Sequence, residues 1–213
     1  MKLDVRLIAI LDPSTLGTDA LAAARAAAAG GATALQVRMK NSPAAEILRW
    51  TERLVEALAV PVYVNDRADI AWAAGAAGVH LGADDLPVAR VRAAAPRPLL
   101  IGISVGTESE AQAVLDAAPD YWSIGSVYPT PSKADAGAPI GTDGLRRLAG
   151  RAPPGVPVIG IGGITAENVG EVIAAGAVGV AVIGAIFGAS DPEQAARRLR
   201  DAVDAGGART RRA

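Results

Sequence analysis

Eight short apolar runs, separated by alanine-rich segments with helical spacing, constrain the fold of this chain more than any other feature. The runs lie at residues 7–11, 34–37, 62–64, 79–81, 99–103, 121–124, 158–161 and 178–183. Near-continuous apolar strands that alternate with helices are typical of a parallel sheet covered on both faces. Eight such units in 213 residues match the lower size limit of a closed (β/α)8 barrel, or TIM barrel, which we predict; a doubly wound open sheet is the alternative.

Start signals for helices lie between the runs. Thr107 is followed three residues later by Glu110, the spacing of a capping box, and Asp191-Pro192 precedes Gln194. Two further starts are expected at Ser42-Pro43 and at Thr165. No linker interrupts the series, so we predict one catalytic barrel domain over residues 1–205, followed at 206–213 by a basic tail that is expected to be disordered.

Composition excludes several classes of function. The formal net charge of -1 gives no basic surface for nucleic acid, and the hydrophobic content of 51% excludes a disordered chain. The absence of cysteine excludes thiolate chemistry, and the single histidine argues against a histidine metal cluster or a Ser-His-Asp triad. We interpret that histidine, His80, as a packed or supporting residue rather than an acid–base group.

One segment has the length of a membrane span, because residues 172–189 carry no charge. Its four glycines and its lack of leucine indicate instead a helix end, a buried strand and two turns. Charge in Met1 to Arg6 comes too early for a signal peptide, so the cytoplasm is the expected location. We expect no membrane partner, and a homodimer stays open.

The run at residues 34–37 continues into an alternating polar pattern. Gln36, Arg38 and Lys40 occupy every second position, so an extended strand places them on one face. An amide and two cations that converge where a strand leaves the core suit a phosphorylated small molecule better than a packed interior. The first hypothesis is therefore an enzyme that binds anions.

Two carboxylates follow neighbouring runs. Asp66 comes after the third run beside Asn65, and Asp85 comes after the fourth. In a TIM barrel the strand ends meet at the active site, where two carboxylates and substrate phosphates would favour Mg²⁺. The alternatives are that Asp66 caps a helix and that Asp84-Asp85 interacts with the first turn of another.

Lysine is rare here, with three lysines against eighteen arginines, so Lys40 and Lys133 are candidates for phosphate contacts that require a compact ammonium; ordinary loop lysines are the alternative. Lys133 lies in a long segment, residues 125–139, that we expect to act as a lid. Gly162-Gly163 and Gly184 follow the last two strands and would offer main-chain N–H groups to a phosphate.

With these motifs in place, the chain resembles the thiamine phosphate synthase family over nearly its whole length. The matching segments are 36–40 (QVRMK), 64–67 (VNDR), 78–82 (GVHLG) with Asp85, 102–104 (GIS), 128–133 (YPTPSK), 161–164 (IGGI) with Asn168, and 179–183 (GVAVI). The resemblance implies a TIM barrel transferase of thiamine biosynthesis. Such an enzyme joins 4-amino-2-methyl-5-hydroxymethylpyrimidine diphosphate to (carboxy)thiazole phosphate, giving thiamine monophosphate and pyrophosphate.

The resemblance also implies the role of each site residue. Asp66 and Asp85 would hold Mg²⁺, and the catalytic side chains would be those of Arg38, Lys40, Ser104 and Lys133. Substrate contacts would come from residues on six of the strand ends, namely Gln36, Arg38, Lys40, Asn65, Ser104, Thr130, Ser132, Lys133, Gly162, Gly163, Ile183 and Gly184.

Five positions depart from the family pattern: Ala83, Gly106, Ser126, Ser132 and Gly184. Ser132 keeps a hydroxyl and Gly184 keeps its main-chain N–H, so phosphate binding is still expected. Three alternatives stay open. They are the related thiazole tautomerase, whose catalytic histidine would fall at Ser126; a class I aldolase with Lys133 as Schiff base; and a non-catalytic binder of thiamine precursors.

Overall fold

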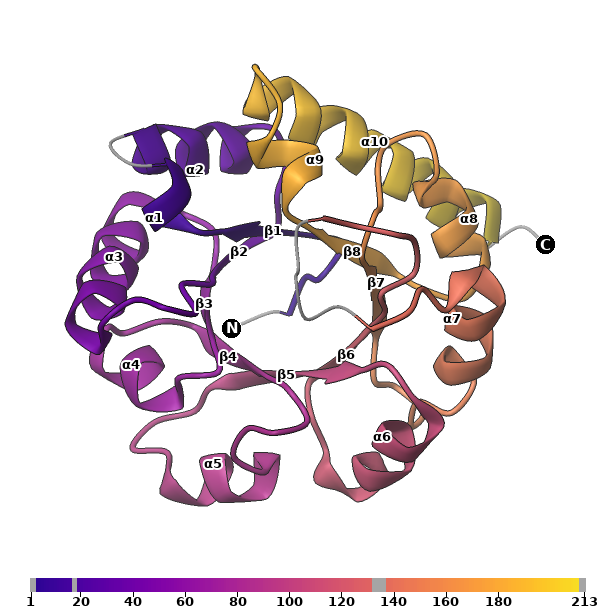
Figure 1. Cartoon of the computed structure of the whole chain (residues 1–213), viewed down its shortest axis with the longest axis horizontal. Coiled ribbons are helices and arrows are strands. Elements are labelled where there is room, and N and C mark those ends of the chain that lie inside the picture. The colour runs from indigo at the N-terminus through magenta and orange to yellow at the C-terminus, as the bar shows by residue number, and fades with distance from the viewer. Residues whose placement is uncertain (1–2, 17–18, 132–136, 211–213) are drawn as a thin grey trace.

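A computed structural model of the chain describes residues 3–16, 19–131 and 137–210. Within this part of the chain, eight parallel strands close into a barrel in sequence order, and each pairs with the next (Figure 1). The strands are β1 (Leu7–Leu11), β2 (Ala34–Val37), β3 (Val62–Asn65), β4 (Gly78–Leu81), β5 (Leu100–Val105), β6 (Tyr121–Ile124), β7 (Val158–Ile161) and β8 (Gly179–Val182). The predicted (β/α)8 fold is confirmed, and the open sheet is excluded because β1 pairs with β8.

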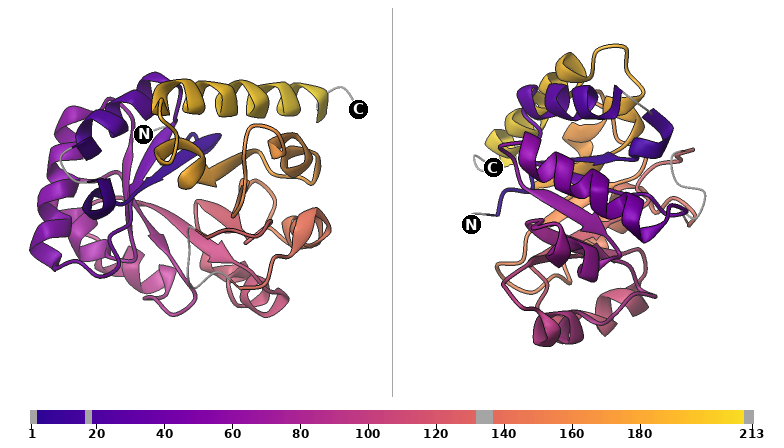
Figure 2. Two further views of the ribbon diagram at one scale, coloured as in Figure 1. Left: turned by 45° about the horizontal axis from the view of Figure 1, so that its top comes forward. Right: turned by 90° about the vertical axis from the view of Figure 1, so that its left-hand side faces the viewer.

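The helices surround this ring of strands (Figure 1). They are α1 (Pro13–Leu16), α2 (Ala20–Ala29), α3 (Ala44–Ala57), α4 (Ala68–Ala73), α5 (Val88–Ala94), α6 (Glu108–Ala113), the 3₁₀ helix η2 (Leu115–Ala117), α7 (Gly141–Ala149), α8 (Val169–Ala174), α9 (Gly184–Phe187) and α10 (Pro192–Thr210). The long helix α10, which follows β8, packs against α2 of the first unit and α8 of the seventh, so the last unit closes the ring of helices (Figure 2).

Strand alternation divides the apolar residues into two cores. Leu7, Ala9 and Leu11 of β1 belong to the outer core between strands and helices, whereas Ile8 and Ile10 belong to a smaller core inside the barrel. Successive side chains of a strand point to opposite faces, so a run that looks uniformly apolar fills both layers.

Two tyrosines fill the inner core, and glycines make room for them. A Cβ at Gly102 of β5 would collide with the ring of Tyr121, and a Cβ at Gly78 of β4 would meet the ring of Tyr63. Both rings are almost fully buried, and their centroids lie 6.2 Å apart. Large side chains from two strands thus occupy space that small residues on the neighbouring strands leave open.

Two of the helix starts follow their sequence signals closely. Thr107 Oγ1 accepts a hydrogen bond from the Glu110 N–H, and the Glu110 carboxylate accepts in return, which completes the capping box of α6. Asp191 Oδ1 accepts from the Gln194 N–H at the start of α10. The start expected at Thr165 comes later, since α8 begins at Val169.

The disordered tail predicted from residue 206 is wrong for residues 206–210, because α10 continues through Thr210. Gly206 is buried, and a Cβ there would contact Ile173 of α8. Leu199 and Val203 of α10 are also buried. Close packing on α8 therefore stabilises helix in a segment whose two glycines lower its intrinsic helix propensity. Residues 211–213 lie outside the described part.

The uncharged segment 172–189 folds as the end of α8, strand β8 and helix α9, as its glycines predict. Among the described residues, no helix is long and apolar enough to cross a membrane.

Candidate active site

A cavity of about 960 Å³ opens at the carboxyl ends of the barrel strands. It brings together most of the side chains expected at the site. The predicted residues that line it are Gln36, Arg38, Lys40, Asn65, Asp66, Asp85, Ser104, Thr130, Gly162, Gly163, Ile183 and Gly184. The two remaining predicted residues, Ser132 and Lys133, lie outside the described residues, as does the middle of the expected lid.

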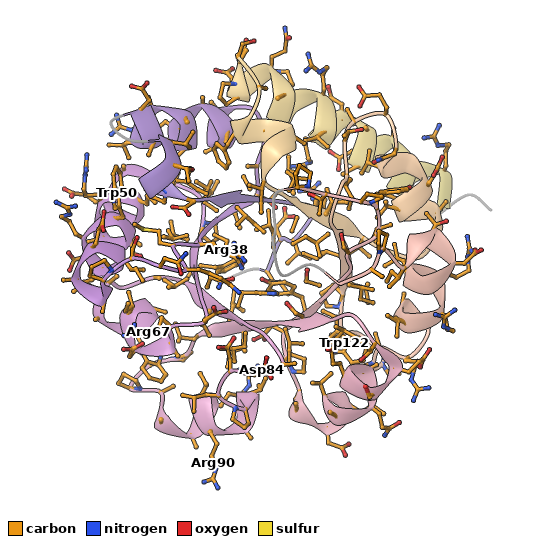
Figure 3. All side chains as sticks on the ribbon, in the orientation of Figure 1. Arg38, Trp50, Arg67, Asp84, Arg90 and Trp122 are labelled. Carbon is orange, nitrogen blue, oxygen red and sulfur yellow. The ribbon has the colours of Figure 1, made fainter. Side chains whose placement is uncertain are left out.

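The polar trio at the end of β2, formed by Gln36, Arg38 and Lys40, lies as its alternation predicts. Gln36 is buried and Arg38 half-buried, and both line the cavity together with Lys40. The intervening Val37 and Met39 belong to the outer core instead. Arg38 points toward the centre of the barrel in Figure 3, whereas Arg90 of α5 points away from it. The strand therefore presents two cations and an amide to whatever enters the cavity.

Asp66 has a backbone conformation that few residues adopt. It follows β3 with a φ of 64°, in the left-handed region, and its N–H donates to the His80 carbonyl oxygen at 2.8 Å. Aspartate and asparagine tolerate this region better than most non-glycine residues. On the neighbouring strand's loop, Asp85 Oδ2 accepts from the Gly82 N–H at 2.6 Å. These two main-chain bonds place both carboxylates at the rim of the cavity.

The two carboxylates interact directly. Burial first, and then the hydrogen bond and charge of Asp85, raise the pKa of Asp66 from 3.8 to about 6, against the opposing influence of Lys40 and Arg38. Like charges that are partly removed from water favour a shared proton or a bound cation. The structural alternatives are not supported, because α4 begins at Ala68 without a side-chain cap and the first turn of α5 contains no acidic residue.

This pair fits Mg²⁺ better than it fits a metal held by protein alone. No group of three or more His, Cys, Asp or Glu side chains in the described ranges could hold a metal ion. Mg²⁺ commonly binds through one or two carboxylates and completes its octahedral shell with water and substrate phosphate oxygens. Asp66 and Asp85 are the residues that would hold it.

The opposite side of the cavity is built from main chain. Gly162 and Gly163 have φ values of 98° and 64°, and a Cβ at either position would collide with the β6–α7 loop, at Ser126 for Gly162 and at Tyr128 for Gly163. Only glycine fits both the conformation and the close approach. Gly184 is exposed and begins α9 beside them. The bare backbone that the glycines predicted therefore lines the cavity.

His80 lies at the floor of the cavity in a chain of hydrogen bonds. Its Nδ1 lies 2.9 Å from the Tyr121 hydroxyl, and its Nε2 lies 3.0 Å from Ser104 Oγ. The ring is buried, in agreement with a supporting rather than an exposed histidine.

Sequence reasoning did not place Tyr121, Ser123 or Glu110 in the site, although all three line the cavity. Period-two alternation in β6 could have placed Tyr121 and Ser123 on the inner face. The sequence indicates Glu110 only as part of the capping box. Its Oε2 accepts from the Gly106 N–H at 2.6 Å, and this bond brings the carboxylate to the cavity where Gly106 departs from the family pattern.

The comparisons with known proteins agree with one another. The family described as thiamine monophosphate synthase matches residues 7–186. The thiamine-phosphate synthase of Moorella thermoacetica is 47% identical over 191 residues, which cover 88% of this chain and 90% of that protein. The thiamine-phosphate synthase of Roseiflexus castenholzii is 48% identical over 179 residues, covering 83% of this chain and 78% of that protein.

A solved structure of a thiamine phosphate pyrophosphorylase from Pyrococcus furiosus superposes with a TM-score of 0.84 at 36% identity, and the match covers 95% of this chain and 97% of that chain. The family match extends across most of the barrel, and the relatives are nearly 50% identical in sequence. Both findings agree with the cavity described above. The chain belongs to the thiamine monophosphate synthase family.

Proposed function

We propose that this cavity joins hydroxymethylpyrimidine diphosphate to thiazole phosphate, giving thiamine monophosphate and pyrophosphate. The observation that supports the proposal is that groups suited to phosphate or to its metal ion lie on two different sides of the cavity. Arg38, Lys40 and the Asp66–Asp85 pair lie at the ends of β2, β3 and β4, while the glycine main chain lies at the ends of β7 and β8. Two separate phosphate sites suit two phosphorylated substrates that must meet between them.

The reaction requires no protein nucleophile. The C–O bond between the pyrimidine methylene and the diphosphate breaks, and pyrophosphate leaves with the electron pair. The thiazole nitrogen then donates its lone pair to the methylene carbon to form the C–N bond. Arg38 and Lys40 would stabilise the charge that develops on the departing pyrophosphate, and Gln36, Asn65 and Ser104 would orient the pyrimidine half.

The thiazole half would bind on the other side. Thr130, Gly162, Gly163, Ile183 and Gly184 line that part of the cavity and would hold its phosphate through a hydroxyl and main-chain N–H groups. Ser132 and Lys133 remain proposed contacts from outside the described residues.

Mg²⁺, when bound by Asp66 and Asp85, would neutralise part of the diphosphate charge and so favour its departure. Both substrates are charged phosphate esters, which cross a lipid bilayer poorly, so we propose the cytoplasm as the location.

The alternatives have less support. The Ser126 hydroxyl, at the position where a tautomerase would use histidine, donates to the Tyr128 carbonyl oxygen at 2.8 Å. A hydroxyl so engaged supplies no acid–base group near neutral pH. A Schiff-base aldolase would require Lys133 to be trapped covalently by borohydride in the presence of a carbonyl substrate. The relatives' names favour the synthase over both of these and over a non-catalytic binder.

One assay tests the proposal. The purified protein is incubated with both phosphorylated halves and Mg²⁺, and thiamine monophosphate and pyrophosphate are measured together. We expect stoichiometric formation of the two products, and loss of activity in EDTA that added Mg²⁺ restores. Undiminished activity in EDTA would reject the metal, and release of neither product would reject the synthase.

Matched variants locate the chemistry. Arg38→Ala is expected to lower kcat about 100-fold or more, because it removes a cation beside the leaving group. Arg90→Ala, which removes an exposed arginine that points away from the barrel, should leave kcat unchanged (Figure 3). Similar losses in both variants would indicate a general charge effect rather than a site.

A further inference from the structure

We propose that His80 is a positioning residue which, held in one tautomer by Tyr121, turns the Ser104 hydroxyl into a fixed hydrogen-bond donor toward the ligand in the cavity. The three side chains come from β4, β6 and β5 and form one chain, with Tyr121 Oη 2.9 Å from His80 Nδ1 and Ser104 Oγ 3.0 Å from His80 Nε2. Only the identity of the ligand rests on the proposed function.

The direction of these hydrogen bonds, that is, which group donates and which accepts, is set at Tyr121, the buried end of the series. Tyr121 is 1% exposed, and among the described residues His80 Nδ1 is the hydrogen-bond partner that the structure gives its hydroxyl. Burial raises the pKa of Tyr121 well above its usual value, so the phenol keeps its proton. A buried O–H without an acceptor is costly. The Tyr121 hydroxyl must therefore donate, and Nδ1 must accept.

Packing also fixes the position of the Tyr121 ring beside the His80 imidazole. Its ring stacks on the imidazole of His80, with centroids 5.6 Å apart and planes inclined by 29°. It also fills the space left by the missing side chain of Gly102. Contacts on two strands thus hold the phenol in place, so its oxygen cannot move away from His80 Nδ1 without displacing the ring.

The tautomer of His80 in turn determines the direction of the Ser104 hydroxyl in the cavity. A neutral histidine that accepts at Nδ1 carries its proton on Nε2. That N–H donates to Ser104 Oγ, so the Ser104 hydroxyl proton is directed away from His80. Ser104 is half-buried and lines the cavity. It therefore offers a donor, which suits a phosphate oxygen or a ring nitrogen of the substrate.

The first experiment uses the fact that His80 is the only histidine in the chain. In tag-free protein labelled with ¹⁵N-histidine, a long-range ¹H–¹⁵N spectrum reports the tautomer of this one ring without assignment. Above neutral pH we expect a proton on Nε2 and a bare Nδ1, and Tyr121→Phe should shift the spectrum toward a mixture of tautomers. A wild-type ring protonated on Nδ1, or on both nitrogens, would overturn the proposal. This test needs no activity, so its result is separate from that of the proposed function.

The second experiment compares two amides of different reach at position 80. His80→Gln places its amide near the former Nε2 and can still donate to Ser104, whereas His80→Asn reaches only the Nδ1 side. We expect His80→Gln to keep kcat within about threefold of wild type and His80→Asn to lower it about tenfold, the size of one lost hydrogen bond. The KM for thiazole phosphate should be unchanged in both.

A structural role for His80 predicts a different pattern. Both variants would then lose activity and thermal stability together, and that result would reject the positioning role. Adding Ser104→Ala to His80→Asn should cause little further loss of kcat, because the two residues act through one hydrogen bond. Additive losses would also reject it. The spectrum of the wild-type protein decides the tautomer even where a variant fails to fold.

Discussion

Tyr63 and Tyr121 lie side by side inside the barrel, with ring centroids 6.2 Å apart, yet their hydroxyls differ: that of Tyr121 is hydrogen-bonded to His80, whereas that of Tyr63 has no hydrogen-bond partner in the part of the chain that the structure describes. Both side chains are almost completely buried. Tyr63 therefore reports the cost of burying a hydroxyl without a partner, and Tyr121 reports the effect of burying one that is hydrogen-bonded.

Removing the two hydroxyls should change stability in opposite directions. Tyr63→Phe relieves an unsatisfied buried group, so we expect the free energy of unfolding to rise by about 1 kcal/mol. Tyr121→Phe leaves the His80 imidazole short of a partner and should lower it by roughly 1–2 kcal/mol. Urea unfolding monitored by circular dichroism measures both. A loss of stability in Tyr63→Phe would show that its hydroxyl is satisfied in solution, for example by a buried water molecule.

Tyr63 also predicts how stability depends on alkaline pH. Burial raises its pKa from 10.0 to about 12. Above pH 10 the unfolded chain releases the phenol proton while the folded chain retains it, so stability falls as pH rises through this window. Tyr63→Phe removes the effect, and its unfolding free energy should fall less steeply between pH 10 and 12. Parallel pH profiles of the variant and the wild type would contradict the prediction.

The carboxylate pair should destabilise the metal-free protein. The pKa of Asp66 is raised from 3.8 to about 6, so the folded state loses stability as pH rises through this range and Asp66 ionises beside Asp85. Asp66→Asn removes the charge and tolerates the same left-handed backbone. At neutral pH in EDTA we expect it to melt about 2–4 °C higher, the shift of roughly 1 kcal/mol in a chain of this size.

Mg²⁺ provides the control for this prediction. Added Mg²⁺ should raise the melting temperature of the wild type but not that of Asp66→Asn, because the variant lacks one of the two ligands. The advantage of the variant should also vanish in acid, where Asp66 is protonated. Equal stabilisation of both proteins by Mg²⁺ would place the metal elsewhere.

Even the smallest side chain at position 102 should destabilise the protein. A Cβ there would collide with the ring of Tyr121, so Gly102→Ala should cost about 1–3 kcal/mol of stability and disturb the histidine behind that ring. Gly150→Ala, at the end of α7, meets only ordinary contacts of 3.6 Å and should be neutral or slightly stabilising. Thermal unfolding compares the two. Similar melting temperatures would mean that the inner core can repack.

The capping box of α6 should be measurable on its own. Thr107→Ala removes the acceptor of the Glu110 N–H, a bond of 3.1 Å, and should cost about 1 kcal/mol, while Thr107→Ser keeps the hydroxyl and should cost little. Because Glu110 also holds the Gly106 N–H at the cavity, the alanine variant should show faster hydrogen exchange in the β5–α6 loop. Equal exchange in both variants would argue against this link.

The sequence by itself determined the barrel and most of the strand boundaries. The hydrophobic pattern of a segment and the glycine, proline and polar residues that end it are local properties of the sequence. Residues 7–11, 34–37 and 158–161 were predicted as strands and form β1, β2 and β7 with the same limits. The alternation of Gln36, Arg38 and Lys40 was sufficient to place them together in the cavity. Once the strands were counted, the polar residues that follow them had to meet at one end of the barrel.

Contacts between distant strands were decided only by the tertiary structure. His80 and Tyr121 are 41 residues apart, and nothing in either segment indicates that one orients the other. The helical residues 206–210 likewise depend on the packing of Gly206 against Ile173, which outweighs the low helix propensity of glycine. The proximity of Asp66 and Asp85 followed from the fold, but the raised pKa of Asp66 required its burial. Burial and partner identity arise from the closed barrel as a whole, so local sequence cannot specify them.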